Sequence, residues 1–368
     1  MVSIVKGLFI NNKKAQDSIY ESGLMVYNCL KLSSKYKLDY IEITPDQRKI
    51  PLGYDFYFFN YHPNTMAWMD TSRLKNIPGI IITIVLEVLP GDPFVMCPDN
   101  HFHSYCVLDP TIKIHNKKVF AFPRPLEVVD SIKPYEKREI PVIGTFGFAT
   151  KGKGFHHVVE AVNREFNEAV VRINIPYGDF VPESETYAKF LANICRKKAK
   201  EGIEVVVTHE YMSKEKLIDW CAQNTLNCFL YDRDIQGLAA TTDQAIVSGR
   251  PLAVSKNDTF RHILMYLTPY PEITLSEAIE KSIPAVKQMQ HDWSREIFAQ
   301  RFEEMLDILI SRHPFKKQQD GDYEIPLAKK GVIEFLQKRY RKYKRFLSIK
   351  KLKRMLVKRR RITDEEFI

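Results

Sequence analysis

Short apolar runs alternate with amphipathic stretches through the first 310 residues of the chain. Apolar runs of about four to eight residues are typical of buried parallel strands, and the longer stretches show the spacing of helices that cover a sheet. The alternation predicts an α/β fold with doubly wound parallel sheets. The strands expected in the first third are Ile4–Ile10, Tyr40–Ile43, Phe56–Phe59, Gly79–Val85, Ser104–Leu108 and Val119–Ala121, and the first helix is 16–32.

A proline-rich break divides this pattern. Two prolines lie in Phe122–Pro125, and the charged segment 130–140 contains a third. Proline fixes φ and removes a backbone donor, so regular structure ends there. We therefore predict a first domain at 1–125, a linker at 126–140, a second domain at 141–312 and a tail at 313–368. Two Rossmann-like domains joined in this way would face each other across a cleft, where ligands meet the carboxyl ends of the strands.

The second domain repeats the alternation of strands and helices. The expected strands are Val142–Thr145, Val170–Ile175, Glu204–Thr208, Cys228–Leu230 and Pro251–Val254. The expected helices are 155–167, 183–202, 214–224, 242–248 and 294–310. In the last of these helices the apolar residues recur at helical spacing, which predicts a face buried in a core.

Composition narrows the class of protein. The chain has 368 residues, 45% of them hydrophobic, which excludes a disordered chain and suits two domains. Its longest apolar stretch, 77–90, is interrupted by proline, glycine and glutamate and is shorter than the roughly 20 residues of a spanning helix. The six cysteines form no C-x-x-C pair, so we expect a reduced, cytoplasmic chain without a metal site or a prosthetic group.

A glycine-bearing turn opens the second domain. Residues 144–155 read GTFGFATKGKGF, which predicts a strand, a turn and a helix start. Glycines let backbone amides approach an anion, a helix N-terminus adds partial positive charge, and Lys153 adds a full one. The turn thus suits a diphosphate, although glycine turns of this kind also occur for structural reasons alone.

A second segment changes this interpretation. Residues 236–254 read QGLAATTDQAIVSGRPLAV, and residues 206–217 between the two turns read VVTHEYMSKEKL. In their order, and in the spacing from Gly147 to Lys153, the three segments resemble the donor half of the group-one, glycogen-synthase-like GT-B glycosyltransferases. The resemblance covers 142–309; the first 125 residues match by topology only. It implies a GT-B fold and a nucleoside-diphosphate sugar, a UDP- or GDP-sugar, as donor substrate.

The resemblance implies roles for named residues. Lys153 would pair with the donor diphosphate and act in catalysis, with a solvated lysine as the alternative. Tyr211 and Met212 would lie beside the nucleobase, or pack as a cap. The donor-binding residues expected on this basis are Gly144, Thr145, Gly147, Phe148, Lys153, Tyr211, Met212, Gln236, Gly237, Leu238, Ala239, Ala240, Thr241 and Gln244.

Three positions depart from the family pattern. Gln236 and Gln244 stand where the family has glutamate, and Phe148 stands where it has arginine. Glutamine keeps hydrogen-bonding capacity but loses the negative charge. Asp243 or Arg233 would be placed to compensate, and the sequence assigns neither. The departures leave open both the stereochemical outcome and a non-catalytic sugar-nucleotide-binding or glycan-binding protein on the same fold.

The acceptor half has weaker signals. Glu87 ends an apolar strand and could orient or deprotonate an acceptor hydroxyl, or it could cap a helix or pair at the surface. His101 and His103 lie near Asp99, but no third ligand supports a metal site, so ordinary loop histidines are expected. His62 is a further candidate at the cleft.

The basic charge belongs to the tail. Residues 337–361 contain 14 Lys or Arg and no acid, out of a net charge of +10, so the rest of the chain is close to neutral. Apolar residues on one helical face of the tail suit an interfacial helix on an anionic membrane. Packing on the body and binding of nucleic acid are the alternatives.

The function expected from these observations is transfer of a sugar from a nucleoside-diphosphate donor to a hydroxyl of a glycan or lipid-linked acceptor. Such a reaction would serve cell-surface polysaccharide synthesis at the inner membrane face. The tail motivates a further alternative, a glycosyltransferase directed at nucleic acid.

Overall fold

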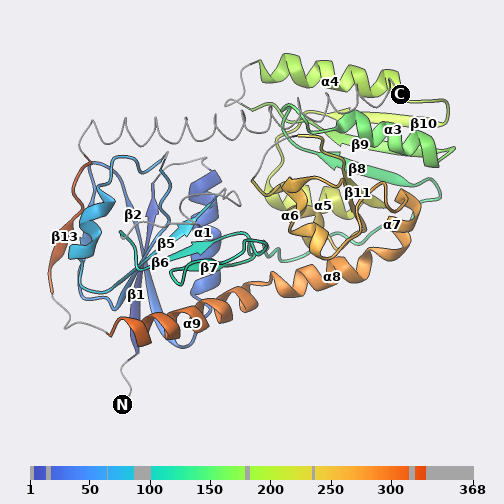
Figure 1. The fold of residues 1–368 in the computed structure, drawn as a ribbon. Coiled ribbons are helices and arrows are strands. Elements are labelled where there is room, and N and C mark those ends of the chain that lie inside the picture. The colour runs from blue at the N-terminus through green and yellow to red at the C-terminus, as the bar shows by residue number, and fades with distance from the viewer. Residues whose placement is uncertain are drawn as a thin grey trace, which may run out of the picture.

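The computed structural model describes residues 4–13, 18–63, 65–86, 101–178, 183–233, 237–314 and 320–328. Figure 1 shows two α/β units side by side, with the helices α8 and α9 running below both. Each unit contains a parallel sheet with its own order of strands. The predicted α/β class with two Rossmann-like domains is confirmed.

The first sheet has the order β2-β1-β4-β5-β6-β7, and all its pairings are parallel. Its strands are β1 (Val5–Asn12), β2 (Tyr36–Ile43), β4 (Phe56–Phe59), β5 (Ile80–Val85), β6 (Ser104–Val107) and β7 (Val119–Ala121). The four side chains of β4 are all buried, because a central parallel strand is covered on both faces. Helix α1 (Ser18–Leu30) packs on one face, and the short η1 (Thr71–Asn76) contributes Leu74 to the core on the other.

The second sheet has the order β10-β9-β8-β11-β12 and is also parallel. Its strands are β8 (Val142–Phe146), β9 (Ala169–Asn174), β10 (Ile203–Thr208), β11 (Leu226–Phe229) and β12 (Leu252–Val254). The helices that cover it are α3 (Phe155–Glu165), α4 (Ser184–Lys198), α5 (Lys214–Ala222), α6 (Thr241–Val247), α7 (Leu275–Lys281) and α8 (Ile283–Asp292). The 3-10 turns η2 (Asp258–Phe260) and η3 (Ile263–Met265) follow β12.

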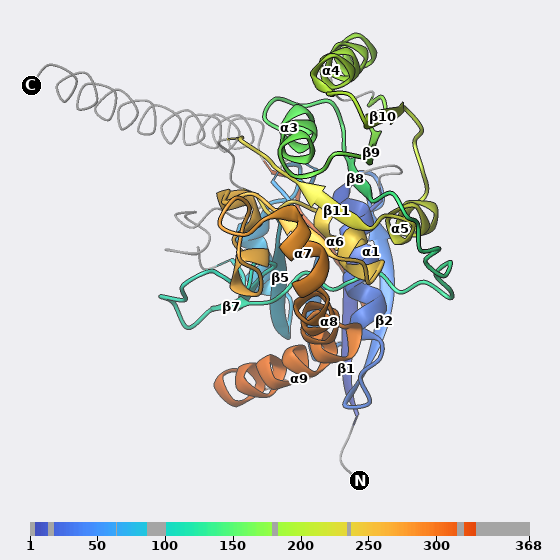
Figure 2. The same ribbon diagram turned by 90° about the vertical axis from the view of Figure 1, so that its right-hand side faces the viewer.

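The chain crosses between the domains twice. At the first crossing Phe122 packs in the core of the first domain and Leu126 in that of the second. At the second crossing α8 leads into α9 (Arg295–Arg312), as Figure 2 also shows. Helix α9 buries Phe302 between Tyr36, Phe56 and Phe58 of the first domain.

The predicted buried face of the closing helix is therefore confirmed, but it packs against the first sheet. This packing contradicts the predicted second-domain range 141–312 at its end, because sequence spacing does not say which core an amphipathic helix joins. The chain then stays with the first domain, since β13 (Asp322–Glu324) pairs antiparallel with β3 (Lys49–Pro51). The basic segment 337–361 lies outside the described residues.

The described part of the chain contains neither a candidate membrane-spanning helix nor a disulfide bond. No helix there is long and apolar enough to cross a membrane. The cysteines described are free and buried, namely Cys29, Cys106, Cys195, Cys221 and Cys228.

Candidate functional site

The turn after β8 is built from glycines in backbone conformations that other residues rarely adopt. Gly147 has a φ of 143°, Gly152 of 77° and Gly154 of 64°. A Cβ atom on Gly154 would lie 1.8 Å from the carbonyl oxygen of Leu230, just past the end of β11. Only glycine permits this approach, which holds the turn against the neighbouring strand and lets α3 begin at Phe155.

Lys153 folds back over this turn toward the carboxyl end of the sheet. A Cβ atom on Gly147 would lie 3.1 Å from Nζ of Lys153 and 3.6 Å from Cγ2 of Thr241. Nζ donates a hydrogen bond of 2.9 Å to the hydroxyl of Tyr231, which also contacts Oγ1 of Thr241 at 2.9 Å. The structure thus brings together three predicted residues, Gly147, Lys153 and Thr241, and adds Tyr231, which the sequence analysis missed.

Arg233 lies on the same aromatic ring as Lys153. Its guanidinium carbon is 5.1 Å from the centre of the Tyr231 ring, and Lys153 Nζ is 4.5 Å from that centre. Arg233 Nη2 donates to Oγ1 of Thr259, which in turn donates to the carbonyl oxygen of Gly237. Two cations therefore flank one tyrosine at the carboxyl end of the sheet.

Neither cation has a carboxylate partner among the described residues. Arg233 Nε is buried without a hydrogen-bond partner there, and burial lowers the pKa of the guanidinium. A desolvated cation is costly unless an anion faces it. The two cations and the N-terminus of α3 beside them suit a diphosphate.

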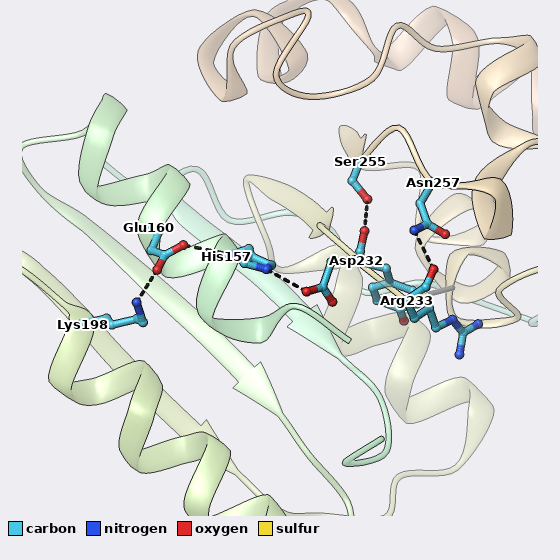
Figure 3. Close-up of polar contacts among 8 residues, drawn as sticks. His157, Glu160, Lys198, Asp232, Arg233, Ser255 and Asn257 are labelled. Carbon is cyan, nitrogen blue, oxygen red and sulfur yellow. Dashed lines mark hydrogen bonds and ion pairs between the residues drawn. The ribbon is translucent and has the colours of Figure 1, made fainter. Parts of the chain in front are cut away.

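The carboxylate of Asp232, the residue before Arg233, contacts His157. Figure 3 shows Asp232 turned toward His157, whose Nε2 lies 3.2 Å from the carboxylate while its Nδ1 contacts Glu160 at 3.1 Å. Lys198 pairs with Glu160, and this bond, followed by the one from His157, lowers the pKa of Glu160 to about 2. Asp232 and Glu160 are thus paired with His157 and Lys198 and not with Arg233.

The backbone that carries Tyr231 and Arg233 is held in place by two side chains. Ser255 Oγ donates to the carbonyl oxygen of Tyr231 at 2.7 Å, and Asn257 Nδ2 donates to that of Arg233 at 2.9 Å (Figure 3). Both residues follow β12, the edge strand of the sheet. Their sequence signal is only a turn after a strand, so they could not be assigned to the site in advance.

Two aromatic residues lie at the outer edge of the site. The ring centroids of Phe148 and Tyr211 are 6.3 Å apart, and Tyr211 is 77% exposed. This exposure contradicts the alternative that Tyr211 packs as a cap. Asn174 fixes the loop that carries Tyr211, because its side chain bonds both the backbone N–H and the carbonyl of Glu210. Met212 is half-buried.

Two of the predicted binding residues make close contacts within the protein. Gly144 lies within β8, and a Cβ atom on it would be 1.9 Å from Nδ2 of Asn224, so it serves packing. Ala239 is buried, and its backbone N–H already donates to the carbonyl of Thr259. These contacts give both residues a role in packing, and their role in binding the donor stays a prediction.

Other predicted residues lie near the site without a contact that assigns them. Thr145 is fully buried, and its Oγ1 has no partner among the described residues. Gly237 has open space where a Cβ would point, and Gln244 is half-buried. Leu238 and Ala240 precede α6, which begins at Thr241. Gln236 and Glu87 lie outside the described residues.

A polar network occupies the carboxyl ends of β1, β2 and β4 in the first domain. Asn60 Nδ2 donates to Asn11 Oδ1 at 2.7 Å, and Asn11 Nδ2 donates to the hydroxyl of Tyr40. Tyr20 and Tyr40 both donate to Glu42 Oε1, at 2.6 and 3.1 Å. The bond to Glu42 and burial raise the pKa of Tyr20. Sequence reasoning missed this network, because its members come from separate segments.

The network lies on the side of the first domain that meets the second. Glu21, next to Tyr20 on α1, lies 3.8 Å from Lys214 at the start of α5. Lys214 also pairs with Glu127 in the crossing segment, at 3.1 Å. Glu21 of the first domain therefore lies close to Lys214, three residues after Tyr211.

The histidines of the first domain have ordinary structural contacts. His101 Nδ1 bonds Thr71 Oγ1 at 2.8 Å, and His103 Nδ1 accepts from the backbone N–H of Ile81. His62 is buried. The described residues contain no group of three metal-ligating side chains.

Comparison with solved structures identifies the fold. No family model and no curated protein matches the sequence. Among solved structures, a glycosyltransferase from Rickettsia africae aligns with a TM-score of 0.57 and 9% identity, over 83% of this chain and 98% of that one. HepE from Anabaena, in complex with UDP and glucose, aligns with a TM-score of 0.53 and 12% identity, over 83% and 100%.

A third structure, the lipopolysaccharide outer core galactosyltransferase WaaB, aligns with a TM-score of 0.53 and 11% identity, over 83% of this chain and 99% of that one. At such identities the likeness establishes the fold. The fold is GT-B, as the sequence predicted.

Proposed function

We propose that the protein is a glycosyltransferase that moves a sugar from a nucleoside-diphosphate donor to a hydroxyl of a glycan or lipid-linked acceptor. The observation that carries the proposal is the pair Lys153 and Arg233 on the ring of Tyr231, without carboxylate partners among the described residues. Lysine and arginine, beside a helix N-terminus, match the charge of a diphosphate.

The chemistry follows from where charge develops. As the bond between sugar and phosphate breaks, negative charge grows on the departing diphosphate. Fixed cations stabilise this charge more than they stabilise the bound donor, which lowers the barrier. Lys153 is the proposed catalytic residue, and Arg233 also stabilises the charge on the departing diphosphate. The hydroxyl of Tyr231 positions the ammonium of Lys153 by a hydrogen bond.

The donor base is proposed to lie beside Phe148 and Tyr211. An exposed ring at the carboxyl end of a sheet offers a flat base a stacking surface. HepE, which shares the fold, was crystallised with UDP and glucose, and this supports a UDP-sugar over a GDP-sugar.

The acceptor is proposed to meet the network around Glu42. A carboxylate that two phenols hold, at a position facing the second domain, can accept hydroxyl hydrogen bonds from a glycan. The likeness to WaaB, a lipopolysaccharide enzyme by name, supports a role in cell-surface polysaccharide synthesis.

One observation favours a second candidate, a sugar-nucleotide-binding protein without transferase activity. Asp243, the carboxylate next to Gln244, is buried and paired with Arg124 rather than directed at the cations. No other carboxylate replaces the charge that Gln244 lacks among the described residues near Lys153.

The test is turnover with a panel of UDP- and GDP-sugars, followed as release of nucleoside diphosphate with and without glycan acceptors. Turnover of one donor supports the glycosyltransferase. Tight donor binding without turnover under any acceptor supports the second candidate, and absence of binding by every donor contradicts both.

The tail suggests where the reaction takes place. We propose that residues 337–361, with 14 basic residues and no acid, hold the protein at an anionic membrane surface on its cytoplasmic side. Co-sedimentation with vesicles that contain phosphatidylserine should exceed that with neutral vesicles. Binding to duplex DNA or RNA in place of vesicles would identify the nucleic-acid alternative.

A further inference from the structure

An ion pair joins the two domains at one side of the site. Asp109 follows β6 of the first domain, and Arg261 follows η2 of the second. Nε and Nη2 of Arg261 lie 2.9 and 2.5 Å from Oδ2 of Asp109. The side chains are 11% and 2% exposed, so the pair is shielded from solvent and from screening by salt.

A second ion pair joins the first crossing to α6. Arg124 Nε lies 3.0 Å from Asp243 Oδ2, with side chains 19% and 8% exposed. Arg124 stands between Phe122 and Leu126, where the chain leaves one core for the other. The other carboxylate oxygen of Asp243 is buried without a partner among the described residues.

One residue of each ion pair lies two positions from a threonine that is hydrogen-bonded to Arg233 or to the tyrosine that holds Lys153. Arg261 lies two residues after Thr259, which accepts from Arg233 and donates to Gly237. Asp243 lies two residues after Thr241, which contacts the hydroxyl of Tyr231, the acceptor of Lys153. The Asp109–Arg261 pair is thus connected to Arg233 through Thr259, and the Arg124–Asp243 pair is connected to Lys153 through Thr241 and Tyr231.

A neutral histidine packs between the two pairs. His262 follows Arg261 and is 2% exposed, and its Nε2 lies 3.4 Å from Thr242 Oγ1 on α6. Its ring stacks at 5.5 Å on Trp293, where the chain crosses between the domains for the second time. The two pairs and both crossings therefore form one packed unit.

We propose that Asp109, Arg261, Arg124 and Asp243 are positioning residues that couple the approach of the two domains to the binding of a diphosphate by Lys153 and Arg233. This inference rests on the proposed function, since it takes the diphosphate as the ligand. If the pairs hold Thr259 and Thr241 in place, they hold the cations at the spacing that the ligand needs. Linkage is reciprocal, so the bound diphosphate stabilises the pairs in return.

The test compares the full-length protein with Asp109→Asn and Arg261→Lys, which keep shape or charge, and with the control Glu272→Gln. Glu272 pairs with Lys256 at 2.7 Å on the surface of the second domain, and both side chains are exposed. Calorimetric titration with UDP, GDP, uridine and guanosine gives the affinities, and thermal unfolding shows that each variant folds. Small-angle scattering without ligand reports how closely the domains approach.

The inference predicts that Asp109→Asn weakens nucleoside-diphosphate binding about tenfold, a coupling of ordinary size, and enlarges the radius of gyration. Nucleoside affinity stays unchanged, Arg261→Lys has a smaller effect, and Glu272→Gln has none. Equal losses for nucleoside and diphosphate, or unchanged diphosphate affinity and radius, would overturn it. If the unmodified protein binds no nucleoside diphosphate, the proposed function fails; if it binds and the Asp109 variant matches it, only the coupling fails.

Discussion

The ammonium of Lys153 lies 2.9 Å from the hydroxyl oxygen of Tyr231 and 4.5 Å from the centre of the same ring. The lysine is thereby held by a hydrogen bond and by the face of an aromatic ring, rather than left to move in solvent. A cation fixed before the ligand arrives needs little reorganisation when charge develops on a leaving group.

Replacing Lys153 with alanine should lower the turnover of the donor by about 100- to 1,000-fold, the usual effect of removing one group that stabilises transition-state charge. The measurement is steady-state release of nucleoside diphosphate. Lys151→Ala is the matched control, because Lys151 lies in the same turn and is exposed. A variant at Lys153 that is as active as the control would exclude a catalytic role.

Replacing Tyr231 with phenylalanine removes the hydroxyl between Lys153 and Thr241 but keeps the ring. We expect a loss of about 3- to 10-fold in kcat/KM, since one such bond contributes about 0.5–1.5 kcal/mol. Tyr231→Ala, which also removes the ring, should lose more. Equal activity of the phenylalanine variant and the unmodified protein would show that the hydroxyl does not position Lys153.

Gly154 should tolerate no side chain. Its φ is 64°, and a Cβ would lie 1.8 Å from a backbone carbonyl. Gly154→Ala should therefore lower the free energy of unfolding by more than about 1 kcal/mol. Gly237→Ala is the control, since its Cβ position has nothing within 4 Å. Chemical denaturation measures both, and equal stability of the two variants would contradict the close approach.

Tyr211 should contribute to binding and not to stability. Because its side chain is 77% exposed, Tyr211→Ala should leave the melting temperature unchanged. Loss of the stacking surface should weaken nucleoside binding by about 0.5–1.5 kcal/mol. Phe190→Ala removes another exposed ring, 56% exposed on α4, and serves as the control. Unchanged nucleoside affinity in the Tyr211 variant would move the proposed base site elsewhere.

His262 should make stability depend on pH. Burial, followed by the charges of Arg124 and Arg261, lowers its pKa from 6.5 to about 3. Below pH 6.5 the unfolded chain binds a proton that the folded chain does not take up until about pH 3. Acidification through this window therefore favours unfolding, by at most about 1.4 kcal/mol per pH unit. Urea unfolding of His262→Gln between pH 7 and pH 4 should show a smaller slope, and an equal slope would contradict the buried neutral state.

The sequence predicted most of the sheet strands, because parallel strands such as Phe56–Phe59 are apolar throughout and bounded by turn residues. It assigned the closing helix to the second domain, whereas α9 packs in the first, because the buried face of such a helix fits either core. The pairing of β13 with β3 joins segments about 270 residues apart, and no local pattern encodes that contact.

The site was predicted where its residues share a motif and missed where they do not. Gly147, Lys153 and Thr241 belong to recognisable turns, and the structure brings them together. Tyr231 follows β11 with only an ordinary strand-end pattern before it. The inter-domain pair of Asp109 and Arg261 spans 152 residues, so only the folded chain reveals it.

Lys153 and Arg233 are proposed to bind the donor diphosphate. The most direct measurement is calorimetric titration of UDP and uridine, with GDP and guanosine beside them, into the unmodified protein and into the double variant Lys153→Gln, Arg233→Gln. We predict that the unmodified protein binds one nucleoside diphosphate at least about 100-fold more tightly than its nucleoside, as two charge-assisted contacts allow. The double variant should lose this preference while remaining folded. Equal affinity of the unmodified protein for nucleoside and diphosphate, or a preference that survives in the double variant, would contradict the claim.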